Sequence, residues 1–399
     1  MKFEELGLAE TLLRAVRAEG YTTPTKIQSA AIPAVLQGRD VLGCAQTGTG
    51  KTAAFALPTL QRLGNGPTPG GRRAIRALVL APTRELAGQI GESFGAYGRH
   101  TALRHAVVYG GVGQHPQVRA LRAGVDILIA TPGRLLDLMQ QGHVDLARVE
   151  VLILDEADRM LDMGFIHDLR RIVAKAPARR QTLLFSATMP PAIRQLAGQW
   201  LRDPVDVKVN PVAKAADTVR QSVMFVEQAN KIRTLTQWLK TTAWTRTLVF
   251  TRTKRRADKV ATLLRQSGIA ADSFHADKSQ AARQKSLARF KSPRPAVLVA
   301  TDIAARGLDI DMVSHVINYD LPIDAENYVH RIGRTGRAGA DGVALSFCDA
   351  AERGTLHAIQ RLTRQTLAIE GQDKSLPARK PDVTRGMKPG RRDRVIGRR

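Results

Sequence analysis

The sequence contains few cysteines and no long apolar run, and each shortage excludes a class of protein. Its two cysteines, Cys44 and Cys348, lie far apart in the chain, so they cannot build a disulfide framework or a thiolate metal site on their own. We expect both to be small core residues. No apolar run approaches the roughly 18 to 20 residues of a membrane helix, and the start MKFEELGLAETLL lacks the basic-then-apolar pattern of a signal peptide. We therefore expect a cytoplasmic protein without membrane contacts.

Acidic residues are scarce relative to basic ones. The chain has 61 Lys and Arg against 36 Asp and Glu, which gives a formal net charge of +25. Residues 371–399 hold ten of the basic residues and three Asp, so this segment carries +7 and the rest of the chain +18. Because the body is itself basic, the composition favours a polyanionic partner. A solvated basic surface without a partner would have the same composition, so charge alone does not decide.

Apolar runs alternate with helix-like stretches along most of the chain. With 399 residues, 43% of them hydrophobic, the chain is long enough for two α/β domains with real cores. Runs such as RALVLA, VDILIA and TLLFSA occur before residue 209, and RTLVFT and PAVLVAT occur after a polar pause at NPVAKAADT. Strands separated by helices predict an α/β fold with two mostly parallel sheets, each covered by helices on both faces.

The same pattern predicts where the domains begin and end. We expect a first domain at 1–209, a linker at 210–217 and a second domain at 218–370. The segment 371–399 is rich in Arg, Lys, Gly and Pro and has no apolar period, so we expect a basic disordered tail there.

The segment AQTGTGKT at 45–52 lies between a short apolar run and a good helix, which is the context of a phosphate-binding loop. Glycines let backbone N–H groups turn toward phosphates, Lys51 would neutralise the β- and γ-phosphates, and the Thr52 hydroxyl would ligate Mg²⁺. ATP and Mg²⁺ are therefore the expected cofactors. A glycine-rich turn that binds nothing is the alternative. The expected nucleotide-binding residues of this loop are Thr47, Gly48, Thr49, Gly50, Lys51 and Thr52.

The segment VLILDEADRML at 151–161 ends an apparently buried strand in a cluster of carboxylates. Carboxylates at the carboxyl end of such a strand face the crevice where α/β sheets bind ligands. Asp155 would hold Mg²⁺, directly or through water, and Glu156 would accept a proton from the water that attacks the γ-phosphate. Asp158 would fix neighbouring loops by hydrogen bonds. The alternative is an acidic first helical turn, which the upstream phosphate loop makes less attractive.

The motifs DEADRMLDMGF, KSQ at 278–280 and HRIGRTGRAG make the chain resemble DEAD-box ATP-dependent RNA helicases of superfamily two, and the bacterial RhlE-type subgroup in particular. The resemblance covers residues 1 to about 365, with every motif in order. It implies two tandem RecA-like domains and RNA-stimulated ATP hydrolysis. It also implies local, non-processive unwinding of RNA duplexes or remodelling of RNA–protein complexes. We expect a monomer, with ribosomal or RNA-decay proteins as candidate partners.

The resemblance assigns further residues to the nucleotide. Gln28 in GYTTPTKIQ would bond both the donor and the acceptor of the adenine edge, which an amide can do, although it could simply be a polar helix residue. Phe3 would pack on the base, and Asp309 would contact the ribose. Arg334 and Arg337 would reach the γ-phosphate from the second domain, where a planar fork suits phosphate oxygens. A solvated arginine face is the alternative. The expected catalytic set is Lys51, Asp155, Glu156, Arg334 and Arg337, with Thr52 and Asp155 at the metal.

The resemblance also implies a path for RNA, with contacts to the backbone that position a strand without reading its sequence. The pairs Pro-Thr and Thr-Pro in the first domain could equally cap helices. The second domain departs from many relatives at HADK, 275–278, which puts only a local turn in doubt. The expected RNA contacts are Thr83, Arg84, Gly111, Thr131, Arg134, Arg252, Gln280, Arg283, Thr301 and Asp302. The residues expected to couple ATP chemistry to strand separation are Asp158, Ser186, Thr188 and His330.

Three functions remain open at this point: an RNA-stimulated ATPase that separates RNA strands, a DNA helicase or translocase, and a non-catalytic RNA-binding or annealing protein. An intact set of Lys51, Asp155, Glu156 and Arg334 argues against the third. Contact with the 2′-hydroxyl distinguishes RNA from DNA and cannot be read from motifs, so only the resemblance favours the first function over the second.

Overall fold

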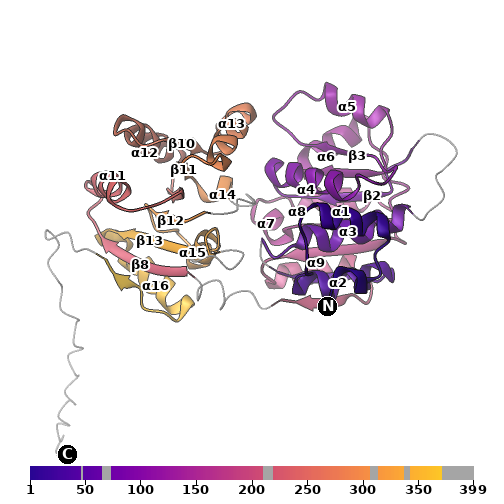
Figure 1. Cartoon of the computed structure of the whole chain (residues 1–399). Helices are drawn as coiled ribbons and strands as arrows, with labels where there is room; N and C mark the ends of the chain where they lie inside the picture. The colour runs from indigo at the N-terminus through magenta and orange to yellow at the C-terminus, as the bar shows by residue number, and fades with distance from the viewer. Residues whose placement is uncertain (46–47, 65–72, 210–218, 306–312, 337–341, 371–399) are drawn as a thin grey trace, which may run out of the picture.

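The computed structural model describes the chain except for residues 46–47, 65–72, 210–218, 306–312, 337–341 and 371–399 (Figure 1). The expected linker at 210–217 and the expected disordered tail at 371–399 therefore lie outside the described residues. Two seven-stranded sheets dominate the fold, and every strand pair in them is parallel. The prediction of two parallel α/β sheets is confirmed.

The first sheet has the order β3-β4-β2-β5-β6-β1-β7. Its strands are β1 (Val41–Cys44), β2 (Ala77–Leu80), β3 (His105–Val108), β4 (Ile127–Ala130), β5 (Val151–Leu154), β6 (Gln181–Ser186) and β7 (Val205–Lys208). Its helices are η1 (Phe3–Leu6), α1 (Glu10–Ala18), α2 (Lys26–Leu36), α3 (Lys51–Gly64), α4 (Arg84–Tyr97), α5 (His115–Arg122), α6 (Pro132–Gln140), α7 (Ala157–Asp162), α8 (Ile166–Val173) and α9 (Pro191–Trp200).

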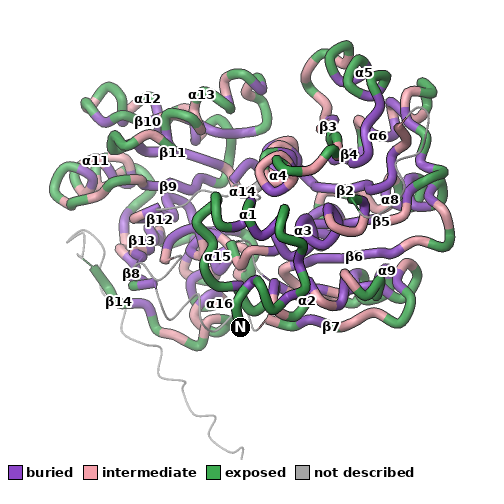
Figure 2. Tube along the Cα trace, turned by 45° about the vertical axis from the view of Figure 1, so that its right-hand side comes forward, coloured by how far each residue is buried: buried purple, intermediate pink, exposed green. Residues whose placement is uncertain are grey.

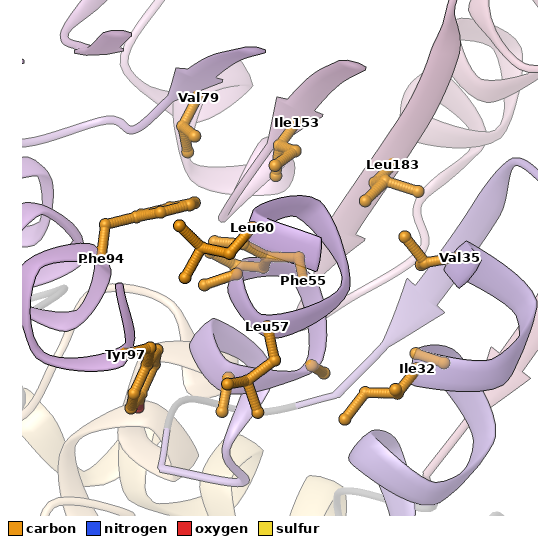
Figure 3. Packing of buried hydrophobic residues seen from close by; sticks show 14 of the residues in the cluster. Ile32, Val35, Phe55, Leu57, Leu60, Val79, Phe94, Tyr97, Ile153 and Leu183 are labelled. Carbon is orange, nitrogen blue, oxygen red and sulfur yellow. The ribbon is translucent and has the colours of Figure 1, made fainter. Parts of the chain in front are cut away.

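Alternate strand residues pack against different sets of helices, because successive side chains of a strand point to opposite faces. Val79, Ile153 and Leu183 belong to the core under η1, α1, α2, α3 and α4. Figure 3 shows Phe55 of α3 at the centre of this layer, and its ring lies 5.5 Å from that of Phe185. The intervening strand residues pack instead against α5 through α9. Helices therefore cover both faces, as predicted.

The second sheet has the order β10-β11-β9-β12-β13-β8-β14, and helices again cover both of its faces. Figure 2 shows that burial in both domains is concentrated along the strands. Cys348 lies in the second core, whereas Cys44 is only half-buried. The strands are β8 (Val219–Phe225), β9 (Arg246–Phe250), β10 (Ala271–Phe274), β11 (Ala296–Ala300), β12 (His315–Asn318), β13 (Gly342–Cys348) and β14 (Ala368–Ile369). The helices are α11 (Lys231–Thr241), α12 (Lys254–Gln266), α13 (Gln280–Lys291), α14 (Asp302–Ala305), α15 (Ala325–Ile332), η2 (Ala350–Glu352) and α16 (Arg353–Thr363).

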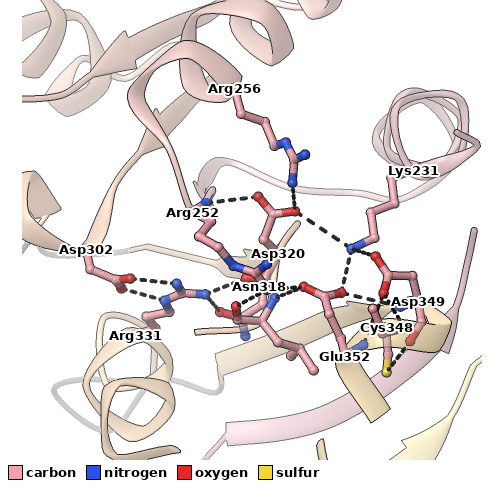
Figure 4. A network of polar contacts seen from close by, with 12 residues as sticks. Lys231, Arg252, Arg256, Asp302, Asn318, Asp320, Arg331, Cys348, Asp349 and Glu352 are labelled. Carbon is pink, nitrogen blue, oxygen red and sulfur yellow. Dashed lines mark hydrogen bonds and ion pairs between the residues drawn. The ribbon is translucent and has the colours of Figure 1, made fainter. Parts of the chain in front are cut away.

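A buried ionic network ties together the loops at the carboxyl edge of the second sheet (Figure 4). Lys231, the first residue of α11, has no exposed surface. Its Nζ lies 2.6 Å from Glu352, 3.3 Å from Asp349 and 3.8 Å from Asp320. Each buried charge has partners of opposite sign, and removal of one member would leave its partners buried and unpaired. The cluster is therefore stable only when all its members are present.

Arginines extend the network to loops in which RNA contacts are expected (Figure 4). Arg252 and Arg256 pair with the same carboxylate cluster at 2.9 and 2.6 Å. Arg331 is 2% exposed, and its guanidinium donates to both oxygens of Asp302 at 2.6 and 2.7 Å and to Asn318 at 3.0 Å. The ends of β9, β11, β12 and β13 are therefore held in a fixed relation to one another.

None of the helices in the described part of the chain combines the length and hydropathy that crossing a membrane requires.

Breaking the ionic network should destabilise the second domain. Lys231→Met leaves buried carboxylates without their central cation, so we expect the free energy of unfolding of this domain to fall by about 3–5 kcal/mol. Urea unfolding can be followed by the fluorescence of Trp238 and Trp244, which both lie in this domain. Lys240→Met removes an exposed lysine from the same helix and is the control. Equal midpoints for the two variants would contradict the role given to Lys231.

Candidate nucleotide and RNA site

The expected phosphate loop has the strand–turn–helix form that phosphate binding requires. β1 ends at Cys44, and α3 begins at Lys51. Gly48 and Gly50 have φ values of 84° and 87°, a left-handed conformation that side chains with a Cβ rarely adopt. The N-terminus of α3, with its partial positive charge, follows at once. Thr47 lies outside the described residues.

Lys51 and Asp155 form a buried pair beside this loop. Their Nζ and Oδ1 atoms are 3.7 Å apart, and both side chains are almost fully buried. Burial raises the pKa of Asp155 to about 6, although the charge of Lys51 opposes the shift. Among the described residues, none accepts a hydrogen bond from the Lys51 ammonium, which is costly for a buried charge unless an anion completes the site.

The donor set at this point fits Mg²⁺. Thr52 supplies a hydroxyl and Asp155 a carboxylate, both hard oxygen ligands. Among the described residues, no group of three or more His, Cys, Asp or Glu is arranged to enclose a metal ion. Mg²⁺ is usually held by few protein groups together with phosphates and waters, and not by a cage made of protein ligands alone.

Glu156 lies next to the pair in a strained conformation. Its φ and ψ are 52° and 53°, a left-handed geometry that costs a residue with a Cβ roughly 1–3 kcal/mol. Arg159 donates to its carboxylate at 3.1 Å, and both side chains are buried. Burial alone would raise the pKa of Glu156, but Arg159, Lys51 and Arg334 outweigh it, so the pKa is lowered. Sequence reasoning missed Arg159, although a carboxylate and an arginine three residues apart in a helix commonly pair.

Asp158 joins α7 to the loop after β6. Its Oδ2 accepts hydrogen bonds from the backbone N–H and the hydroxyl of Thr188, each at 2.8 Å. Its own N–H donates to the Ser186 hydroxyl at 3.2 Å. The structure therefore brings together the three expected coupling residues of the first domain.

Residues of both domains line one cleft of about 730 Å³. Glu156, Asp158 and Thr188 line it from the first domain, and His330 and Arg334 from the second. An expected catalytic carboxylate and an expected arginine finger thus face the same space. The other two second-domain residues expected at the nucleotide, Asp309 and Arg337, lie outside the described residues.

The residues expected at the adenine make other contacts in this structure. Gln28 is buried, its Oε1 accepts from the Thr25 N–H at 2.8 Å, and its Nε2 donates to the Gly50 carbonyl at 3.1 Å. It therefore links the start of α2 to the phosphate loop, and binding of adenine would replace these hydrogen bonds. Phe3 lies in the core, stacked on Tyr21 at 6.3 Å.

The expected RNA contacts of the first domain gather where β2, β3 and β4 end. The Thr83 hydroxyl caps α4 by accepting from the Leu86 N–H at 3.3 Å. Arg84 packs so closely on Gly111 that a side chain there would collide with its guanidinium. Arg134 donates to the carbonyl of Val112, the residue after Gly111, at 3.1 Å. Thr131 precedes α6 at the same edge of the sheet.

Two expected RNA contacts of the second domain instead cross to the first. Gln280 Nε2 donates to Glu85 Oε1 at 3.1 Å, and Arg283 pairs with Glu85 Oε2 at 2.9 Å. All three side chains are buried. Sequence reasoning missed Glu85, because its partners are almost two hundred positions away and nothing local identifies them.

The remaining expected contacts of the second domain are held by the ionic network. Arg252 keeps 42% of its side chain exposed while it pairs with Glu352. Asp302 is paired with Arg331. Thr301 is half-buried beside it, and its N–H donates to the Phe274 carbonyl at 3.4 Å. Of these, Arg252 offers the most surface to a ligand.

Comparison with known proteins identifies the family. Residues 25–196 match the DEAD/DEAH box helicase family, and residues 230–339 match the helicase conserved C-terminal domain. The chain is 44% identical over 382 residues to the DEAD-box ATP-dependent RNA helicase CshA of Bacillus cereus (strain ATCC 10987 / NRS 248), with 93% of this chain and 72% of that protein covered. It is 45% identical over 366 residues to the ATP-dependent RNA helicase DeaD of Mycobacterium tuberculosis (strain ATCC 25618 / H37Rv), with 92% and 64% covered.

Solved structures agree with the sequence relatives. S. cerevisiae Dbp5 bound to RNA and ADP BeF3 matches with a TM-score of 0.83 at 32% identity, covering 94% of this chain and 96% of that one. A Dbp5 variant bound to Gle1 and IP6 matches with a TM-score of 0.76 at 33% identity, covering 94% and 95%. The matches extend over both parallel sheets and over the motifs that line the cleft. The chain therefore belongs to the DEAD-box RNA helicase family.

Proposed function

We propose that this protein hydrolyses ATP when RNA is bound and uses the cycle to separate short RNA duplexes locally or to remodel RNA–protein complexes. The observation that carries the proposal is the cleft in which Glu156 and Arg334 face each other from different domains. A catalytic set divided in this way is complete only when the domains are together. Hydrolysis therefore depends on the ligands that hold the two domains together.

The first domain binds the triphosphate. Backbone N–H groups of the phosphate loop and the buried Lys51 ammonium receive the phosphates. Thr52 and Asp155 are the residues that would hold Mg²⁺, which when bound neutralises charge on the β- and γ-phosphates. Gln28 donates a hydrogen bond to the Gly50 carbonyl of the loop, so adenine binding at Gln28 would be coupled to the position of the loop.

Glu156 orients the attacking water. Arg159 donates a hydrogen bond to Oε2 of Glu156, and both residues line the cleft. Because three cations favour its ionised form, Glu156 is a weak base. We infer that it accepts the proton late, after the water has begun to attack. Arg334 then stabilises the charge that develops on the transferred phosphoryl group.

RNA and nucleotide favour the same closed arrangement of the domains. Glu85 already meets Gln280 and Arg283 across the gap, on the side of the first domain where its RNA contacts gather. A ligand that bridges the domains stabilises closure, and closure in turn favours the other ligand. A strand bent to fit the closed groove cannot remain in an A-form duplex, so closure separates the strands. Phosphate release reopens the groove.

Finer assignments rest on single stretches of sequence. DEADRMLDMGF and HRIGRTGRAG support placing the chain in the RhlE-like subgroup. The basic body supports sequence-independent contact with the RNA backbone. We propose a cytoplasmic monomer because the chain resembles bacterial DEAD-box helicases, and we propose domain bounds of 1–209 and 218–370.

The function is tested by comparing RNA and DNA as activators. We expect single-stranded RNA to stimulate ATP turnover and DNA of the same sequence to do so far less, because the 2′-hydroxyl distinguishes them. Equal stimulation by DNA would favour a DNA helicase.

The variant Glu156→Gln should bind ATP and RNA normally but lose ATP turnover by roughly 10² to 10⁴. Normal turnover by the Glu156 variant would remove the assignment of that residue.

Arg159 should act through Glu156 and not on ATP itself. Arg159→Gln removes the ion pair that holds the Glu156 carboxylate, so we expect kcat to fall roughly 10- to 100-fold, as when an outer-shell partner of a reactive group is removed. KM for ATP should stay near its original value, and Arg159→Lys should recover part of the loss. Steady-state ATPase assays at saturating RNA measure both quantities. A rise in KM without a fall in kcat would place Arg159 on the nucleotide instead.

A further inference from the structure

Apart from the cleft lined by Glu156 and Arg334, one further cleft of the first domain, of about 460 Å³, is lined by several arginines. Residues that precede β5 and β6 line this cleft. Residues that follow the same strands line the cleft shared with the second domain. Since β5 and β6 are parallel, the two clefts open at opposite ends of the sheet. No part of the proposed cycle uses the second one.

Guanidinium groups dominate the lining of this second cleft, which we call the arginine cleft. Arg62, Arg148, Arg179 and Arg180 line it, and Arg148 and Arg179 are exposed to solvent. The carboxylate in the lining, Glu150, is already paired with Arg76 at 2.6 Å. The cleft therefore carries positive charge that its own lining does not neutralise.

Arg180 shows most clearly that an acceptor is missing. Its Nη1 donates to the Pro177 carbonyl at 2.7 Å, but its buried Nε has no hydrogen-bond partner in the part of the chain that the structure describes. Burial lowers the pKa of Arg180, and the charge of Asp40 opposes this shift, but both oxygens of Asp40 accept hydrogen bonds from the backbone N–H groups of Thr182 and Arg202. A buried guanidinium N–H without an acceptor costs free energy, which an anionic oxygen would recover.

We propose that the arginine cleft binds phosphates of the RNA backbone outside the segment held between the domains. The planar fork of arginine matches phosphate oxygens. No aromatic side chain lines the cleft, so it offers no platform for base stacking. It also lacks the exposed large apolar anchors on which protein partners depend. The cleft can therefore attract a ligand mainly through its positive charge. Such charge suits contacts with the RNA backbone that do not depend on the RNA sequence.

A remote backbone contact would change how the enzyme uses RNA. When the domains open after hydrolysis, RNA between them is bound less tightly. The arginine cleft lies within one domain, so its contacts with RNA do not depend on closure. RNA held there stays at high effective concentration for the next cycle. This inference rests on the proposed RNA-dependent function.

The test removes charge from the cleft without disturbing the core. Arg148→Gln/Arg179→Gln changes two exposed residues that line it, and Arg233→Gln/Arg361→Gln removes the same charge from exposed positions on α11 and α16 of the second domain. Binding is measured with a single-stranded RNA of about 8 nucleotides, within the size of one groove, and with one several times longer. Each titration is repeated at two salt concentrations.

We expect the cleft variant to bind the long RNA roughly tenfold more weakly and to flatten its log–log salt slope by roughly 1.4, about 0.7 for each lost contact. Binding of the short RNA and kcat at saturating RNA should not change, and the control variant should match the original protein. Unchanged binding of the long RNA, as expected if an acidic protein occupies the cleft, would overturn the proposal. So would an equal loss for both RNAs. Failure of RNA to stimulate the unmodified enzyme would instead remove the proposed function, since it is measured separately.

Discussion

The common direction of the strands in each sheet is the constraint on which the rest of the structure depends. Parallel strands bring all their carboxyl ends to one edge, where the loops after them meet. In the first sheet this edge holds the phosphate loop, Asp155 and Thr188, and in the second it holds Asp302 and the ionic network around Lys231. The cleft lies between the loops that follow β5 and β6 at this edge of the first sheet, where Glu156 lies, and α15 with the turn after it, where Arg334 lies.

Buried charge is the second constraint, and the two domains satisfy it differently. In the second domain, Lys231 and Arg331 are surrounded by carboxylates and other acceptors within the same fold. In the first domain, the Lys51 ammonium lies 3.7 Å from the Asp155 carboxylate, and no described residue accepts a hydrogen bond from it. A satisfied network stabilises a rigid frame, whereas an unsatisfied buried cation favours binding of an anion. The frame and the site therefore differ in how complete their charge pairing is.

The fold and the local motifs could be predicted from the sequence, because they depend on residues close together in the chain. Alternating apolar runs and helical stretches predicted both parallel sheets, and the positive φ of Gly48 and Gly50 follows from the loop pattern. The pairing of Gln280 and Arg283 with Glu85 could not be predicted, because it depends on how two separately folded domains meet. The burial of Lys231 was equally hidden, since a lysine that begins an amphipathic helix normally faces solvent.

We propose that one active site is shared between the two domains, and substitution of Arg334 tests this sharing most directly. It lies in the second domain, almost fully buried, and its charge acts on Glu156 of the first. Steady-state ATPase assays of Arg334→Ala at saturating RNA, with ATP binding measured in parallel, separate chemistry from affinity. We predict that kcat falls by roughly 10³ or more while ATP affinity changes little, and that Arg361→Ala on the same domain changes neither. Near-normal turnover by Arg334→Ala would contradict a shared active site.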